Sequence, residues 1–427
     1  MFEVKEKPRL VERAFLVSCI HSERDRADAD SLLDELDELT QNLGIHVVAR
    51  QVIRIRKTSP RFILGKGKVD QLLADLKETS ADVLIFDNEI TPAQQRNWES
   101  ESKVLVIDRH EIILDVFAER AQTKEAKLQV KLARLEYSLP RLRRAWSHLG
   151  RQRGGGVTQR GEGEAQIELD QRMVRDQISA TRKEIALVAK QRQTGRSRRQ
   201  KLPLPTVAIV GYTNAGKSTL LNCLTGADAL SADKLFATLD PTSRRLKLPN
   251  GRMVVLTDTV GFIRKLPHRL VDSFKATLEE ALVADLVLHL VDFSNPQYEA
   301  QMSTTDDVLR ELGASEKELI TVFNKMDLVE NDLEKFKAKK LTGRSVFISA
   351  NTGEGIDLLL VELEHFFASS AKPENFTLPY NRYDLVARLK SQGGLIFEET
   401  TEEGYFVKGN PRGDLSSAFE KYRQKEG

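Results

Sequence analysis

The sequence predicts a multidomain α/β protein, and three observations support this fold class. First, 427 residues exceed what one hydrophobic core of ordinary size contains, so two to four domains are expected. Second, short apolar runs alternate with amphipathic stretches in the N-terminal and C-terminal parts, whereas the pattern between them is purely helical. Third, 40% hydrophobic and 30% charged residues are typical of a globular protein rather than a disordered one.

The composition argues against several other classes of protein. No apolar stretch approaches the roughly 20 residues that span a bilayer, and the N-terminus has no apolar signal core, so we expect a soluble, cytoplasmic protein. Cys19 and Cys223 lie far apart without a CxxC pair, which predicts neither a disulfide framework nor a zinc site. The histidines show no HxxxH or HExxH spacing.

Residues 1–110 are expected to form an N-terminal α/β domain. The apolar runs AFLVSCI, IHVVARQVI, VLIFD and VLVID alternate with helical stretches. The two runs that end in Asp87 and Asp108 are predicted to be buried parallel strands, and ligands often bind at the carboxyl ends of such strands. The segment FILGKGKVD places two glycines beside lysines ahead of a helix, either as a phosphate-contacting turn or as a simple connection.

Residues 111–200 are expected to form an antiparallel helical hairpin with a Gly/Arg-rich tip. Leucines repeat at spacings of four and three from Leu128 to Leu142, and a second apolar seam runs from Ile167 to Val188. Pro140 should kink or end the first helix, because proline lacks an amide hydrogen. The segment between the seams, HLGRQRGGGVTQRGEGEAQ, is longer than a helix connection requires.

Positive charge is concentrated in this hairpin. Residues 120–201 contain 21 Lys and Arg but 8 Asp and Glu, a net charge of +13 in a chain whose net charge is +2. Clustered cations displace counterions from a phosphate backbone, and arginines pair with phosphates and stack on bases. We therefore expect residues 111–200 to contact RNA. The alternatives are a solvated helical face and a tip that contacts nothing.

Residues 201–371 are expected to form a Ras-like doubly wound nucleotide-binding domain, followed by a small α+β domain at 372–427. The strand TVAIV leads into GYTNAGKST, which fits the P-loop pattern GxxxxGK[ST]. In such a loop, backbone amides surround the phosphates, Lys217 reaches the β- and γ-phosphates, and Ser218 ligates Mg²⁺. The predicted phosphate-binding residues are Gly211, Tyr212, Thr213, Asn214, Ala215, Gly216, Lys217, Ser218 and Thr219.

Three further motifs follow along the chain. The strand MVVLTD ends at Asp258, which begins DTVG and places a carboxylate near Mg²⁺ and the Gly261 amide near the γ-phosphate. The motif NKxD selects guanine, because the Asp327 carboxylate can accept hydrogen bonds from N1 and the 2-amino group, which adenine cannot offer. The segment VFISAN offers a backbone amide to the guanine O6. The predicted residues are Asp258, Thr259, Val260, Gly261, Asn324, Lys325, Met326, Asp327, Ser349 and Ala350.

Together these motifs resemble those of translation-factor-related GTPases, and the wider arrangement resembles the HflX family of ribosome-associated GTPases. The resemblance rests on FATLDPT, DTVGFI, a GTP-binding domain placed third and a preceding glycine-rich hairpin, and it covers nearly the whole chain. In that family the threonine of FATLD is the switch residue, which implies Thr238, although spacing alone leaves Thr242 as an alternative. The residues of this switch segment that are predicted to bind the nucleotide are Phe236, Ala237, Thr238, Leu239 and Asp240.

The sequence thus predicts a GTPase with Lys217, Thr238 and Gly261 as catalytic residues and with Ser218 and Thr238 as Mg²⁺ ligands. Phe262 follows DTVG, where Ras-like enzymes have the glutamine that orients the attacking water. We therefore expect slow hydrolysis by the protein alone and activation by a partner. Asn214 matches a P-loop asparagine with which some related GTPases hold a potassium ion.

The resemblance implies that the protein binds the large (50S) ribosomal subunit and the 70S ribosome, with rRNA contacted through residues 111–200. It also implies a role in splitting or rescuing stalled ribosomes under stress. We expect a monomer with no DNA partner. Two alternatives remain open: a ribosome assembly GTPase that acts on precursor particles, and a GTP-switched protein-binding adaptor. An ATP-using RNA remodeller would need a second complete P-loop, which FILGKGKVD does not provide.

Overall fold

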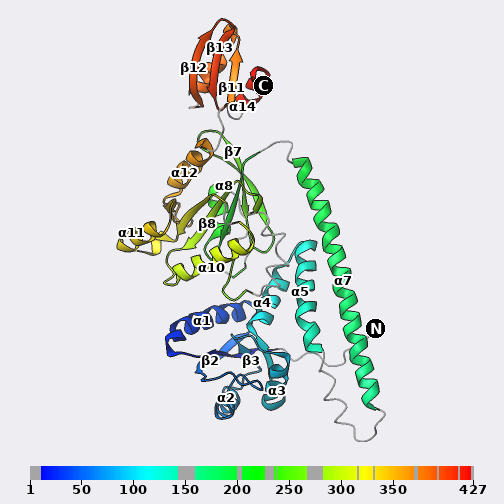
Figure 1. Ribbon diagram of the computed structural model, residues 1–427. Helices are drawn as coiled ribbons and strands as arrows, with labels where there is room; N and C mark the ends of the chain where they lie inside the picture. Colours follow the sequence, from blue (N-terminus) through cyan, green and yellow to red (C-terminus); the bar gives the residue numbers. More distant parts are fainter. Residues whose placement is uncertain are drawn as a thin grey trace. The chain divides into compact units, whose positions relative to one another are not determined.

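The chain divides into two compact units, each described here by itself (Figure 1). The first contains Met1–Arg198, Ala232–Asp240 and Val260–Leu278, and the second contains Arg199–Ser231, Pro241–Thr259 and Glu279–Gly427. The computed structural model describes residues 11–142, 159–199, 204–226, 235–236, 238–266, 282–314, 317–329, 332–369, 374–391, 394–411 and 414–424. Within these ranges, no helix is long and apolar enough to cross a membrane.

The first unit is built on a four-stranded parallel sheet, which confirms the predicted N-terminal α/β fold. Its strands are β1 (Arg13–Ile20), β2 (His46–Arg54), β3 (Val83–Phe86) and β4 (Leu105–Asp108), in the order β2-β1-β3-β4. The connecting helices are α1 (Arg26–Asn42), α2 (Lys66–Thr79) and α3 (Pro92–Ser102), with a short 3-10 turn η1 (Glu23–Asp25) before α1. One side of the sheet packs around Phe86 and Trp98, whose ring centroids lie 5.5 Å apart.

Helix α4 (Arg109–Arg120) begins with an arginine that is buried inside this unit. The Arg109 guanidinium is 1% exposed and donates hydrogen bonds to the carboxylates of Asp87, at 2.9 Å, and Glu35, and to the carbonyl oxygen of Leu32 at 3.1 Å. A buried charge of this kind is tolerated only when it is paired and hydrogen-bonded. Arg109 therefore fixes α4 and α1 against the carboxyl end of β3.

The helical middle region contains α5 (Lys124–Leu142) and α7 (Gln159–Arg199), which confirms the predicted hairpin. Leu128 and Leu132 of the first predicted seam are buried, and Ile178 of the second seam is buried. Pro140 lies inside α5, whose described part runs to Leu142. The predicted Gly/Arg-rich tip falls largely on residues 143–158, which lie outside the described residues, so it stays a prediction.

The end of α5 is anchored on the sheet by Asp108. Its carboxylate accepts hydrogen bonds from the backbone amide of His110, from the Tyr137 hydroxyl at 2.9 Å and from the Arg141 guanidinium at 3.2 Å. Burial raises the pKa of Asp108, but the hydrogen bond and charge of His110 and the charge of Arg141 outweigh it, so the pKa is lowered overall. For the neighbouring Glu111, burial and the Asp108 charge raise the pKa to about 7.

The second unit contains a six-stranded sheet in the order β10-β9-β8-β5-β7-β6. Five strands are parallel and β6 runs antiparallel to β7, so the sheet is mixed, and this confirms the predicted Ras-like doubly wound fold. A short turn joins β6 directly to β7, and adjacent strands joined in this way must be antiparallel. The strands are β5 (Thr206–Gly211), β6 (Thr242–Lys247), β7 (Met253–Asp258), β8 (Leu286–Asp292), β9 (Leu319–Asn324) and β10 (Ser345–Phe347).

Helices surround this mixed sheet, and its core is made of aliphatic side chains such as Ile209, Leu256 and Leu288, each 0% exposed. The helical elements are α8 (Lys217–Thr225), α10 (Tyr298–Glu311), η3 (Met326–Leu328), α11 (Asp332–Leu341) and α12 (Ile356–Ser369). Parallel strands bring their carboxyl ends to one edge of a sheet, so the motifs that follow β5, β7 and β9 are expected to meet there.

The C-terminal part forms a small antiparallel sheet in the order β11-β13-β12, as the predicted α+β fold requires. It encloses its own core, which includes Phe376, Leu385, Val407 and Phe419. The elements are β11 (Glu374–Leu378), η4 (Tyr380–Arg382), α13 (Tyr383–Ser391), β12 (Leu395–Thr401), β13 (Gly404–Gly409), α14 (Asp414–Phe419) and η5 (Glu420–Tyr422).

Replacing Arg109 by Ala should destabilise the first unit strongly. The carboxylates of Glu35 and Asp87 would stay buried with one partner fewer, so the free energy of unfolding should fall by about 3 kcal/mol. Urea unfolding followed by the fluorescence of the buried Trp98 measures this change.

The matched control is Arg26→Ala, which removes an exposed ion pair with Glu23. Such pairs contribute about 0–1 kcal/mol, so this variant should unfold nearly as the parent protein does. Equal losses for the two variants would contradict the structural role assigned to Arg109.

Candidate functional site

Two glycines of the P-loop stand where no side chain fits. Gly211 has φ +152°, and a Cβ on it would lie 2.1 Å from the carbonyl oxygen of Leu290 on the neighbouring strand. Gly216 has φ +93°, and a Cβ there would lie 2.4 Å from the side-chain nitrogen of Asn324. The loop therefore packs directly against strands β8 and β9, and its close backbone approach explains the glycines at these two positions.

Lys217 is the only lysine among the described residues that is buried, with 6% of its surface exposed. Its Nζ donates a hydrogen bond of 2.7 Å to the carbonyl oxygen of Tyr212. Burial lowers the pKa of Lys217 to about 8, against the opposing charge of Asp258. In the described part of the chain, the hydroxyl of Thr213 is buried without a hydrogen-bond partner. The loop thus holds a cation and an unsatisfied polar group, both of which a phosphate would stabilise.

Ser218 and Asp258 meet at the start of α8. The Ser218 hydroxyl donates a hydrogen bond of 2.7 Å to the Asp258 carboxylate, although the two residues come from motifs that are 40 positions apart. Next to them, the Thr259 hydroxyl donates to the carbonyl oxygen of Ile209 at 2.7 Å and is fully buried. Hydroxyl and carboxylate oxygens are the ligands that Mg²⁺ prefers, so this pair fits a magnesium ion.

The residues predicted to select guanine lie at the ends of β9 and β10. The side-chain amide of Asn324 donates to the carbonyl oxygen of Ala215 in the P-loop at 2.8 Å, and its oxygen accepts from the backbone amide of Ala350 at 2.9 Å. Asn324 therefore joins three of the four predicted motifs. Asp327 is exposed and available to a base, whereas Ser349 is fully buried.

Sequence reasoning missed Asp292, the last residue of β8. Its carboxylate accepts a hydrogen bond of 2.7 Å from Nζ of Lys325, which has a left-handed backbone with φ +63°. An acidic residue at the end of a parallel strand was the available signal, since Asp87, Asp108 and Asp258 show the same pattern. Asp292 therefore holds the ammonium group of the NKxD lysine in place.

The residues of the FATLD segment that lie in the first unit contact the junction of α4 and α5. The Phe236 ring is 4.5 Å from that of Phe117, and the Asp240 carboxylate accepts hydrogen bonds from the backbone amide and hydroxyl of Thr123. Leu239 is buried, Thr238 is partly exposed, and Ala237 lies outside the described residues. These contacts were not foreseen: Phe236 and Asp240 were predicted to bind the nucleotide.

The alternative switch residue, Thr242, belongs to the second unit. It is the first residue of β6 and pairs with Asp258 across the antiparallel ladder. Its backbone is thus part of a regular strand, whereas the backbone of Thr238 lies outside any strand or helix. A switch residue must change its position between nucleotide states, so Thr238 remains the residue that we favour.

The segment after DTVG is buried in the first unit. Phe262 and Ile263 are at most 1% exposed. Arg264 donates to the Glu35 carboxylate at 3.2 Å and to Asp28 at 3.0 Å, and Lys265 pairs with Asp87. The sequence suggested that a ligand could bind at the carboxyl end of β3. Cationic side chains of this chain occupy that place, so Asp87 binds them instead.

Comparisons with known proteins agree with this geometry. The family models described as GTP-binding GTPase N-terminal, GTP-binding GTPase middle region and 50S ribosome-binding GTPase match residues 30–118, 120–199 and 206–325. A protein of Akkermansia muciniphila named GTPase HflX is 46% identical over 419 residues, covering 96% of each chain. Proteins of the same name from Lacrimispora saccharolytica and Escherichia coli K12 are 44% and 40% identical, covering 95% and 92% of this chain and of their own lengths.

The lowered pKa of Lys217 predicts a pH-dependent nucleotide affinity. Phosphate binding favours the charged lysine, so GDP affinity should change little just above pH 7, where the terminal phosphate of GDP is largely ionised, and should fall by up to about tenfold per pH unit once the pH exceeds about 8. Titration of the protein with a fluorescent GDP analogue from pH 6 to 9 measures the slope.

The control is Lys217→Arg, in which the guanidinium stays charged over the whole range. Its affinity for GDP should be nearly independent of pH, whatever its absolute value. The same downward slope in both proteins would show that another group titrates.

Proposed function

The chain belongs to the HflX family of GTPases and hydrolyses GTP, and we propose that it does so as a factor of the large (50S) ribosomal subunit. In this proposal it binds the 50S subunit and the 70S ribosome and splits or rescues stalled ribosomes under stress. The observation that carries the proposal is the family match, since residues 206–325 match a model described as a 50S ribosome-binding GTPase. Identities of 40–46% over nearly the whole chain support it.

The charge of the helical region supports contact with rRNA. Residues 120–201 carry a net charge of +13, and on α7 the side chains of Arg172, Arg175, Arg182 and Lys183 are exposed. A surface with many exposed cations can bind a phosphate backbone, and the affinity of the protein for RNA should then fall steeply as the salt concentration rises. We propose residues 111–200 as the main RNA-binding region.

The P-loop residues are proposed to bind GTP with Mg²⁺. Lys217 would neutralise the β- and γ-phosphates, while Ser218, assisted by Asp258 and Thr238, would hold the metal. When bound, Mg²⁺ would act as a Lewis acid that stabilises the charge developing on the phosphates. The Gly261 amide is proposed to contact the γ-phosphate, and Asp327 to read the guanine base.

Hydrolysis by the protein alone is proposed to be slow. The Phe262 ring is 1% exposed and has no group that can orient water, so the residue packs in the protein interior instead of acting on the nucleophile. A partner must then supply or position the missing group, and a ribosomal particle is the partner that the family suggests.

Two other functions remain candidates, each with a different expected partner. A ribosome assembly GTPase would be stimulated by precursor particles more than by mature subunits. An adaptor that binds proteins would show no stimulation by any ribosomal particle, and its basic helices would bind with little dependence on salt. The net charge of +13 over residues 120–201 favours the RNA-binding reading over the adaptor.

The central test is GTP hydrolysis with and without purified 50S subunits, 30S subunits and 70S ribosomes, at two salt concentrations. We expect 50S and 70S particles to raise the rate by about 10² or more, and the stimulation to weaken at high salt. The 30S subunit is the control, and it should have little effect. Fast turnover by the protein alone, or equal stimulation by 30S and 50S, would contradict the proposal.

A potassium ion is proposed to assist hydrolysis at Asn214. This residue has a left-handed backbone with φ +60° in the middle of the phosphate-binding loop and a partly exposed side chain. Replacing potassium by sodium at equal ionic strength should slow the 50S-stimulated rate by about tenfold or more, and Asn214→Ala should abolish the difference. Equal rates in the two salts would remove potassium from the mechanism.

A further inference from the structure

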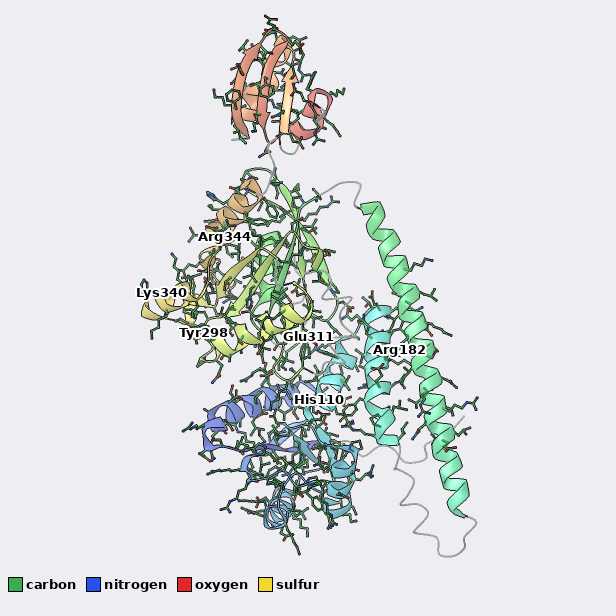
Figure 2. All side chains as sticks on the ribbon, viewed as in Figure 1. His110, Arg182, Tyr298, Glu311, Lys340 and Arg344 are labelled. Carbon is green, nitrogen blue, oxygen red and sulfur yellow. The ribbon has the colours of Figure 1, made fainter. Side chains whose placement is uncertain are left out.

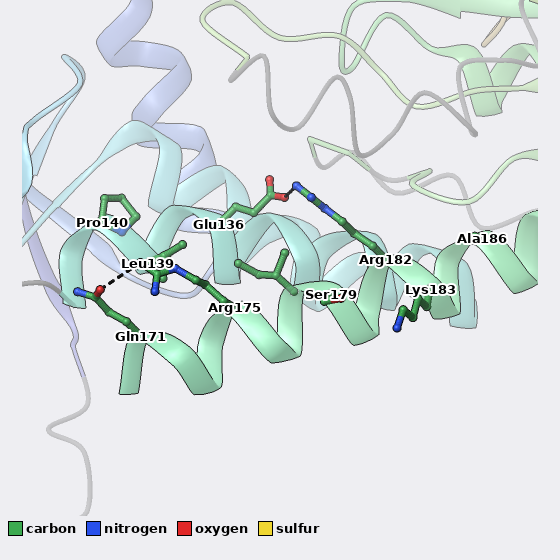
Figure 3. A pocket seen from close by; sticks show the side chains of 10 residues that line it. Glu136, Leu139, Pro140, Gln171, Arg175, Ser179, Arg182, Lys183 and Ala186 are labelled. Carbon is green, nitrogen blue, oxygen red and sulfur yellow. Dashed lines mark hydrogen bonds and ion pairs between the residues drawn. The ribbon is translucent and has the colours of Figure 1, made fainter. Parts of the chain in front are cut away.

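A groove of about 1000 Å³ runs between the end of α5 and the middle of α7 (Figure 3). On α5 it is lined by Glu136, Leu139 and Pro140. On α7 the lining residues recur every three or four positions, so they occupy one face of the helix. Figure 3 shows Arg182 of α7 reaching toward Glu136 of α5, and the groove lies within the first unit.

The groove exists because α7 has small residues where a helical seam needs large ones. Ser179 and Ala186 line it and are exposed, whereas Ile178, which directly precedes Ser179, and Thr181 are buried. Large apolar side chains at both helices would have closed the gap. The apolar floor of the groove consists of Leu139, Pro140 and Ile178.

Positive charge lines this groove. Arg175, Arg182 and Lys183 are all exposed, and the single acidic residue in the lining, Glu136, pairs with Arg182 at 2.7 Å. Arg175 donates to the neutral side chain of Gln171 at 3.3 Å. Among the described residues, neither Arg175 nor Lys183 has a carboxylate partner, so two positive charges of the lining are not compensated.

These cations follow the groove rather than cluster at one point. The eight positions from Arg175 to Lys183 correspond to about 12 Å along the helix axis. A single carboxylate or phosphate cannot reach both, whereas a chain with repeated negative charges can. The apolar floor between the cations suits flat, apolar surfaces such as those of bases.

We propose that this groove binds a single-stranded segment of RNA, with its phosphates at Arg175 and Lys183 and a base against Leu139 and Pro140. The proposal rests on the proposed function and specifies which part of the basic region holds RNA. A segment with four arginines and no acidic residue, such as residues 143–158, does not have the charge that these cations would attract. An acidic peptide is less suitable, since the whole region of 120–201 matches an extended polyanion.

The test compares glutamate at two adjacent exposed positions of α7. Ser179→Glu places a carboxylate inside the groove, four residues from both Arg175 and Lys183, so it pairs with the cations that the RNA would use. Ala180→Glu makes the same change of net charge one residue away, outside the lining. Both substitutions suit a helix, and circular dichroism with thermal unfolding checks that neither variant loses structure.

Binding is measured with a fluorescently labelled ten-nucleotide oligouridylate and, separately, with purified 50S subunits. Ser179→Glu should weaken oligonucleotide binding by about tenfold and reduce the slope of log affinity against log salt by about one, whereas Ala180→Glu should have little effect. Arg175→Gln, which removes a cation without adding an acid, should weaken binding in the same direction.

Equal affinities of the Ser179→Glu and Ala180→Glu proteins for the oligonucleotide would overturn the proposal, as would a preference of the parent protein for a polyglutamate peptide over the oligonucleotide. A change in Trp146 fluorescence in the RNA-free Ser179→Glu protein, without loss of RNA affinity, would show that residues 143–158 occupy the groove and would also overturn it. Failure of the parent protein to bind 50S subunits, with the oligonucleotide still bound in the groove, would reject the ribosomal function but not this site.

Discussion

Two buried carboxylates, Glu35 and Asp87, hold together the parts of the first unit that lie far apart in sequence. Both share Arg109, and each binds one further cation, Arg264 or Lys265. Their exposed fractions are 8% and 2%, so removing either set of partners would leave an ionised group without water or counter-charge. This requirement fixes helices α1 and α4 on the sheet and ties the segment after DTVG to the same place.

The same requirement constrains what a change of nucleotide can do. Thr259 is held by Ile209 within the second unit, and Arg264, five residues later, is held by Glu35 within the first. The two ends of the segment that carries DTVG are therefore each held within their own unit. Asp240, which caps the start of α5, sets a similar limit for the FATLD segment. A nucleotide that favours one conformation of these segments must therefore change the ion pairs or the cap.

Local motifs in the sequence predicted most of the candidate site, because each element of the site is a short strand followed by a loop. Asn324 and Asp258 are the last residues of β9 and β7, as the pattern predicted, and Ser218 lies in the first turn of α8. The contacts of Arg264 and Lys265 join residues 229 and 178 positions apart, and no periodicity or motif indicates such pairs. The antiparallel strand β6 was also missed, since an edge strand with mixed polarity has no signal for direction. The sequence therefore predicts elements and local loops, while long-range ion pairs require the fold.

The ion pairs also bear on how water could be activated. Ras-like hydrolysis needs a group after DTVG that orients water and, often, an arginine that stabilises the charge of the transition state. Here the position after DTVG is the buried Phe262, and the nearest cations along the chain, Arg264 and Lys265, already neutralise Glu35 and Asp87. If either cation moved to the phosphates, a buried carboxylate would lose one of its ion-pair partners. The loss of such a buried partner costs about 3 kcal/mol, which opposes the movement. Arg264 and Lys265 thus serve the structure of the first unit, which agrees with the proposal that an ion or a partner supplies the activating charge.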